Sequence, residues 1–213
     1  SMKDPNVYSR GAWIEDLYEN EFIKYLNVVF PEYTKQREII TALSTMTYMS
    51  KYGGLDGKDF EVSLKPVFEL FREVLNVDLI SGSGDTDLLC AVENPNDENE
   101  IYKMNVDGKS RNSVHNLKAT RLLNHLKING SDYCIIVAPR FSKGIEIDIG
   151  NLPIVAITAE SLSRYISKES LSSSDSLADY VALDDIIRSN LGKNITKNID
   201  DLTIERYGFI AEK

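Results

Sequence analysis

The sequence contains little of what marks secreted, zinc-binding or membrane proteins. Its two cysteines, Cys90 and Cys134, both lie within apolar runs, which is typical of buried free thiols in a reducing compartment rather than of a disulfide framework. Its two histidines, His115 and His125, have neither a cysteine nor a second histidine at ligand spacing, which argues against a zinc site. No apolar run approaches the length of a membrane span, and no signal peptide is visible. We therefore expect a cytoplasmic protein.

Positive charge is also scarce. Lys and Arg number 24 against 33 Asp and Glu, which gives a net charge of −9. Because phosphate contacts supply most of the non-specific affinity for DNA, an acidic chain is not expected to bind nucleic acid tightly by itself. A glycine-rich nucleotide loop is missing too. Gly108-Lys109-Ser110 resembles the end of a P-loop, but the upstream glycine pattern is absent, which argues against an ATPase of that kind.

What is present is the composition of a globular protein that can bury a full core: 213 residues, of which 42% are hydrophobic and 27% charged. Apolar residues at helical spacing within residues 13–26 and 37–49 predict a helical N-terminal lobe, which we assign to residues 3–57. We expect a core over residues 58–168 and a helical C-terminal extension over residues 169–213.

The predicted core alternates helices with strands. A continuous apolar stripe predicts a helix over residues 64–75. Residues 133–138 are a near-continuous apolar run, as expected for a central strand covered on both faces, and residues 152–157 are expected to form the next buried strand. The remaining expected elements are a helix over 113–127 capped by Ser113, a helix over 159–166 capped by Thr158, a Ser-rich connection over 170–176, and helices over 178–191 and 200–207.

The residues with the clearest chemistry lie within residues 81–111, which we interpret as a β-hairpin. Asp87 opens the first strand, and Asp107 and Lys109 stand one residue apart at the end of the second, so their side chains share a face. The opposite, core face would carry Tyr102, Met104 and Val106. Antiparallel pairing would bring Asp87 to Asp107, and two carboxylates meeting at one point predict a hard divalent cation, Mg²⁺ or Mn²⁺, between them. Beside that ion, Lys109 could position a water or offset charge on a phosphate.

These residues resemble a known family. An Asp followed on the next strand by (Asp/Glu)-x-Lys is the signature of the PD-(D/E)xK nucleases. Asp107-Gly108-Lys109 matches its second half in full, while Thr86-Asp87 stands in place of Pro-Asp. The order of the elements resembles the cleavage domain or small cleavage subunit of type IIS restriction endonucleases, of the FokI and AlwI kind. The resemblance covers roughly residues 64–166, including segments 67–70, 135–139 and 154–157.

The resemblance implies an α/β fold, in which a restriction-endonuclease-like mixed central sheet is flanked by helices and carries an added helical N-terminal lobe. It implies Mg²⁺-dependent hydrolysis of DNA phosphodiester bonds, with one strand cut per catalytic domain and Mn²⁺ as a possible substitute. Asp87, Asp107 and the carbonyl of Gly108 would hold the metal, and Lys109 would act on the attacking water. Glu69 would be a third acid facing the site, although a solvated position on its helix is an equal reading.

The resemblance also implies partners. Double-stranded DNA would be the substrate, and a second cleavage domain or a recognition subunit would join as a transient homodimer or heterodimer. Delivery by a separate recognition domain would make the acidic composition tolerable. Basic residues near the proposed cleft are candidate phosphate contacts, with a solvated charged face as the alternative: Arg111, Lys118, Arg121, Arg140 and Lys143.

Several alternatives remain open from the sequence. Asp85 competes with Asp87 as the first metal ligand; we prefer Asp87 because the apolar run starts directly after it. A Holliday-junction or repair nuclease would share the same residues, but such proteins are basic dimers. A catalytically silent assembly module of a restriction complex and an unrelated α/β binding domain are the alternatives outside the nucleases.

Overall fold

The computed structural model describes residues 31–53, 58–80, 86–94, 97–110, 114 and 117–208. The chain divides into two units, Ser1–Glu38 and Ile39–Lys213. Of the first unit, the described part is the beginning of helix α2 (Pro31–Tyr52). Pro31 therefore stands in the first turn of a helix, where its missing N–H costs nothing. The helix predicted within residues 13–26 lies outside the described residues. All the other described elements lie in the second unit.

The second unit is built on a mixed sheet of five strands in the order β1-β2-β3-β4-β5. The strands are β1 (Val74–Leu79), β2 (Leu88–Asn94), β3 (Asp97–Gly108), β4 (Tyr133–Ala138) and β5 (Ile154–Thr158). The first three pair antiparallel, and β3, β4 and β5 pair parallel. The predicted mixed sheet and the predicted hairpin of β2 and β3 are confirmed. Strand β2 ends at Asn94 and β3 begins at Asp97, so residues 95–96 join the two strands in the sequence.

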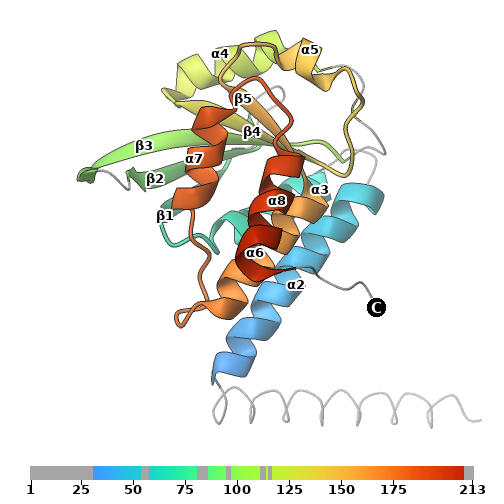
Figure 1. The fold of residues 1–213 in the computed structure, drawn as a ribbon. Coiled ribbons are helices and arrows are strands. Elements are labelled where there is room, and N and C mark those ends of the chain that lie inside the picture. Colours follow the sequence, from blue (N-terminus) through green and yellow to red (C-terminus); the bar gives the residue numbers. More distant parts are fainter. Residues whose placement is uncertain are drawn as a thin grey trace, which may run out of the picture. The chain divides into compact units, whose positions relative to one another are not determined.

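Helices cover both faces of this sheet (Figure 1). One face is covered by α4 (Ala119–Asn129) and α5 (Ile145–Ile149). The other is covered by α2 from Ile39 onward and by α3 (Lys58–Phe68), α6 (Ala159–Ser172), α7 (Val181–Ser189) and α8 (Thr196–Tyr207). The apolar side chains accordingly form two clusters, one on each side of the sheet.

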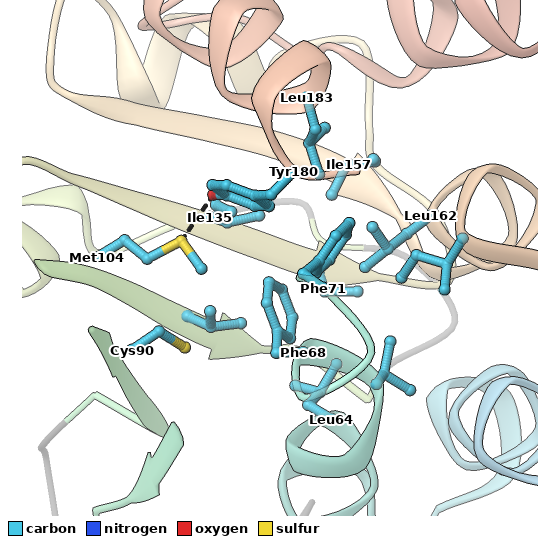
Figure 2. Packing of buried hydrophobic residues seen from close by; sticks show 14 of the residues in the cluster. Leu64, Phe68, Phe71, Cys90, Met104, Ile135, Ile157, Leu162, Tyr180 and Leu183 are labelled. Carbon is cyan, nitrogen blue, oxygen red and sulfur yellow. Dashed lines mark hydrogen bonds between the residues drawn. The ribbon is translucent and has the colours of Figure 1, made fainter. Parts of the chain in front are cut away.

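Strand β4, which lies between β3 and β5, shows the sequence pattern of a strand that is buried on both faces. Tyr133, Ile135 and Val137 point into the larger cluster, and the alternate residues Cys134, Ile136 and Ala138 point toward α4 and α5. A strand buried on both faces has no polar positions, which is why this run was legible as a central strand. Figure 2 shows the larger cluster, in which side chains from α3, the sheet, α6 and α7 meet and Tyr180 Oη donates a hydrogen bond to Met104 Sδ at 2.7 Å. Cys90 and Cys134 are free and buried, as predicted.

The predicted helix over residues 64–75 is wrong in its bounds. Helix α3 ends at Phe68, and its continuation becomes the edge strand β1, in which only Val77 is fully buried. Val77 pairs with Cys90 on β2, so pairing along the edge of the sheet, rather than a helical stripe, orders this segment. A short apolar run fits both periods, and the tertiary pairing decides between them.

Other element ends differ less. Helix α4 begins at Ala119 with Lys118 as its cap, and the predicted cap Ser113 lies outside the described residues. Thr158 caps α6 as predicted, since its hydroxyl accepts a hydrogen bond from the Ser161 N–H. The segment predicted as a Ser-rich connection begins as helix, because α6 continues to Ser172. Helix α8 begins at Thr196 rather than at residue 200, and the short helix α5 was not predicted.

Within the described part of the chain, no helix is both long enough and apolar enough to cross a membrane. The predicted division at residues 57 and 168 stays a prediction. Ile39, Leu43 and Met46 of α2 are buried in the larger cluster together with the sheet residues.

Candidate active site

The register of the hairpin brings the two predicted acids together. Leu88 of β2 pairs with Val106 of β3, so Asp87 stands opposite Asp107 in the next step of the ladder. Leu88 and Val106 point into the larger core, and the two carboxyl groups therefore lie on the opposite face, beneath α4. Asp107 is fully buried and Asp87 is 8% exposed. Two acids are thus held side by side with little access to water.

Backbone hydrogen bonds fix this arrangement at the end of β3. The Gly108 N–H donates to Asp87 Oδ2 at 2.5 Å, which links the acid of one strand to the backbone of the other. The Lys109 N–H donates to the carbonyl of Val137 at 2.8 Å, so pairing with β4 continues past the last residue of β3. The Lys109 side chain consequently returns to the face of Asp107. Its Nζ forms an ion pair with Asp107 Oδ2 and donates to the Gly108 carbonyl at 3.2 Å.

Gly108 is required by close packing between β3 and α3. A Cβ at this position would lie 2.8 Å from Leu64 Cδ1 and 3.1 Å from the Phe60 ring. The end of β3 is therefore pressed against the first turns of α3. Glu61, which lies between these two contacts in sequence, is close enough to act electrostatically on Asp87.

The site carries an excess of negative charge. Burial, and after it the neighbouring charge of Asp107, raise the pKa of Asp87 from an ordinary value of 3.8 to about 7. Lys109 and the Gly108 N–H act in the opposite direction, while Glu61 adds to the rise. Asp107 Oδ2 accepts no hydrogen bond from the part of the protein that the structure describes, although Lys109 neutralises it. A buried carboxylate oxygen with unused hydrogen-bonding capacity, held beside a second acid, suits a hard divalent cation.

The structure brings together Asp87, Asp107, Gly108 and Lys109, as the hairpin predicted. It does not bring Glu69 to them through any contact that we find among the described residues. Glu69 lies just past the end of α3, is exposed, and pairs with Lys65 at 3.7 Å. At about 1.5 Å per helical residue it lies roughly 12 Å along the helix from Glu61. Glu61, whose charge acts on Asp87, was not singled out from the sequence, because the predicted helix began only at residue 64 and α3 begins at Lys58.

The predicted basic residues fall into three groups. Arg121, in the first turn of α4, places one guanidinium nitrogen 3.5 Å from Asp107 Oδ1. Lys118, Arg140 and Lys143 are exposed at the edge of the sheet where β3 and β4 end. Arg111 and the alternative ligand Asp85 lie outside the described residues. Across the residues that the structure places, no group of three or more His, Cys, Asp or Glu side chains is arranged to hold a metal.

The chain resembles known restriction enzymes in sequence and in fold. No protein-family model matches the chain. The type II restriction enzyme HgaI of Avibacterium volantium is 31% identical over 150 residues, which make up 70% of this chain and 29% of HgaI. A structure of the restriction endonuclease FokI matches 71% of this chain and 30% of FokI with a TM-score of 0.50 at 16% identity. A structure of FokI bound to DNA gives a TM-score of 0.47 at 15% identity over the same shares.

The chain thus spans about three tenths of the length of both relatives. The likeness to FokI shows the fold, a mixed sheet flanked by helices, and confirms the predicted fold class. The likeness to HgaI adds a relationship in sequence over most of the chain. The chain is therefore similar over most of its length to a type II restriction enzyme and shares the fold of FokI, as its resemblance to the restriction endonucleases predicted.

Proposed function

We propose that this chain is a DNA endonuclease that hydrolyses phosphodiester bonds with Mg²⁺, cutting one strand per catalytic domain in the manner of a type IIS restriction enzyme. The observation that carries the proposal is the buried pair of Asp87 and Asp107 with Lys109 beside them. A protein that used this hairpin only for assembly would have no need to hold two acids together at a cost in stability. The relationship to a type II restriction enzyme supports the same conclusion.

Asp87, Asp107 and the carbonyl of Gly108 are the residues that would hold the metal. Their oxygens are the donors that Mg²⁺ prefers, and Mn²⁺ can substitute for it. Bound there, the ion would polarise the scissile phosphate and make a coordinated water more acidic. Glu61 would add negative charge next to Asp87, and we place it before Glu69 as the third acid of this centre.

The other roles in the reaction belong to side chains and backbone groups of the protein. Lys109 lies against Asp107, from where its ammonium group can orient the attacking water and neutralise charge that develops on the phosphate. The burial of Asp107 and the hydrogen bond from Gly108 to Asp87 hold both carboxylates in one orientation, which reduces the reorganisation needed during reaction. Lys118, Arg121, Arg140 and Lys143 would contact DNA phosphates along the edge of the sheet, and Arg111 stays a predicted contact.

The proposal includes partners. FokI has been seen bound to DNA, and HgaI is named a type II restriction enzyme; we propose double-stranded DNA as the substrate of this chain as well. Because the chain is acidic and spans only 29% of HgaI, we propose that a recognition domain or subunit delivers it and that a second cleavage domain cuts the other strand. The cytoplasmic location expected from the sequence belongs to the same proposal.

The decisive experiment joins the chain to a sequence-specific DNA-binding domain and offers a plasmid with two facing copies of its site. Tethering raises the local concentration of the cleavage centre and removes weak DNA affinity as an explanation for a negative result. We expect Mg²⁺- or Mn²⁺-dependent cuts beside the sites, reduced at least about 100-fold by Asp107→Asn and by Lys109→Met. Asp201→Asn, which removes an exposed carboxyl on α8, is the control. Absence of cutting by a folded, DNA-bound fusion would refute the proposal, and so would cutting that survives both substitutions.

A further inference from the structure

Arg121 stands in an unusual position for a residue of α4. Its guanidinium lies 3.5 Å from Asp107 Oδ1, on the opposite side of that carboxylate from Lys109 at Oδ2. A single acid is therefore contacted by two cations from two different elements. The Asp107 carboxylate is fully buried, whereas 41% of the Arg121 side chain is exposed. Arg121 thus spans the distance between the buried acids and the surface.

The hydrogen-bonding capacity of Arg121 is largely unused. A guanidinium has five donors in a planar fork. The contact with Asp107 engages one nitrogen at the outer limit of hydrogen-bonding distance, and Nε is buried with no acceptor among the residues that the structure describes. A buried donor without a partner is destabilising, so this position favours an additional anionic ligand. The fork geometry matches the two non-bridging oxygens of a phosphodiester.

Asp107 is also the residue that we assign to the metal. A divalent ion and a guanidinium that approach the same carboxylate repel each other, so each weakens the binding of the other. Lys109 differs from Arg121 in two ways. Its backbone N–H donates to the Val137 carbonyl on β4, which fixes the backbone of Lys109, and its side chain also contacts the Gly108 carbonyl. Arg121 has no second contact of this kind among the described residues, and its long side chain can turn outward.

We propose that Arg121 is an exchanging cation of this site: it neutralises Asp107 in the absence of metal and turns to a phosphate of the DNA backbone when metal is bound. This inference rests on the proposed function and adds a residue that couples metal binding to DNA binding. Arg121 therefore limits metal binding in the absence of DNA, because the metal binds more weakly until a phosphate draws Arg121 away from Asp107. The ligand that completes the site is therefore a phosphodiester, and the metal and DNA bind cooperatively.

The test is calorimetric titration of Mn²⁺ into the unmodified protein, Arg121→Gln and Arg121→Met, each checked for folding by thermal unfolding. Removing a unit charge a few ångströms from a divalent ion predicts a dissociation constant about three- to tenfold lower. Arg121→Lys keeps the charge and should bind Mn²⁺ with an affinity close to that of the unmodified protein. Lys127→Gln removes the same charge from the exposed last turn of α4 and should leave Mn²⁺ affinity unchanged.

Cleavage by the tethered protein at saturating Mn²⁺ should fall at least about tenfold in Arg121→Gln, because the phosphate contact is lost while metal binding is stronger. An arginine that only anchors α4 predicts the opposite change in affinity, since its removal would loosen Asp107. Mn²⁺ affinity that stays the same or weakens in both neutral variants overturns the inference. If the unmodified protein shows no Mn²⁺ binding that depends on Asp107, the proposed function itself fails, which is a different result.

Discussion

Asp87→Asn should make the protein more stable above pH 7 when no metal is present, although it removes a ligand of the proposed centre. The fold holds this carboxyl almost fully buried beside Asp107, and both conditions oppose its ionisation. Asparagine has nearly the same shape and carries no charge. Its side-chain oxygen can still accept the hydrogen bond that the Gly108 N–H donates to Asp87 Oδ2.

The size of the effect follows from the pKa of Asp87. Folding raises this pKa from 3.8 to about 7, so between these values the folded protein binds more protons than the unfolded chain. Stability contributed by the protonated form is fully present below pH 3.8 and is lost as the pH rises through 7. The difference corresponds to about 4 kcal/mol as an upper limit. We expect roughly 2 kcal/mol for the variant at pH 8, because Lys109 and Gly108 interact better with a charged partner than with an amide.

The assay is urea unfolding followed by circular dichroism at pH 4, 5.5, 7 and 8, with a chelator in every sample. The gain from Asp87→Asn should be near zero at pH 4 and increase to its full value above pH 7, where it corresponds to a midpoint of thermal unfolding about 4–8 °C higher. Asp201→Asn, an exposed carboxyl on α8, controls for the change in net charge. A variant that is less stable than the unmodified protein at pH 8, or a difference that does not change with pH, would refute the reasoning.

Three further substitutions test separate parts of the account. Gly108→Ala places a Cβ 2.8 Å from Leu64 Cδ1, so urea unfolding should show a loss of about 1–3 kcal/mol that Leu64→Ala partly relieves in the double variant. Additive costs of the two changes would contradict the packing argument. Tyr133→Phe removes a hydroxyl that donates to Asp184 Oδ1 at 2.6 Å and should lower the free energy of unfolding by about 1–2 kcal/mol with unchanged Mn²⁺ binding. Lys109→Met should lower tethered cleavage at least about 100-fold while Mn²⁺ binding is kept, and weaker Mn²⁺ binding would assign Lys109 a structural role instead.

The parts of the site that sequence reasoning predicted are those set by local periodicity. The alternation of side chains along a strand placed Asp107 and Lys109 on one face and Val106 on the other. Antiparallel pairing over a short connection then brought Asp87 opposite Asp107. Strands β4 and β5 could be predicted because both of their faces are buried, and the Thr158 cap because its side chain acts on its own helix.

The parts that could not be predicted depend on contacts between distant segments. The edge strand β1 buries only Val77 completely, so it lacks the alternation that would have separated it from α3. The predicted helix therefore ran past Phe68 and included Glu69, while its late predicted start at residue 64 left out Glu61. The contact of Arg121 with Asp107 joins a helix to a strand, and no spacing of residues in the sequence predicts this contact.

A second set of contacts beyond the reach of sequence reasoning ties α7 to the sheet. The hydroxyls of Tyr102 and Tyr133 both donate to Asp184 Oδ1, although 82 and 51 residues separate them from this acid. Arg188 donates to the other oxygen of Asp184 at 2.7 Å and stacks over the Tyr102 ring. In the sequence, nothing distinguishes these four residues from other aromatic or charged residues. Only the packing of α7 against β3 and β4 turns them into one buried network.

The most direct test of the central claim, that Asp87 and Asp107 together form a metal centre, is calorimetric titration of Mn²⁺ at pH 7.5. The unmodified protein, Asp87→Asn and Asp107→Asn would be measured under the same conditions. The account predicts saturable binding to the unmodified protein and its loss in both variants, each of which remains folded. Binding that persists unchanged in the two variants, or a folded unmodified protein that binds no Mn²⁺, would contradict it.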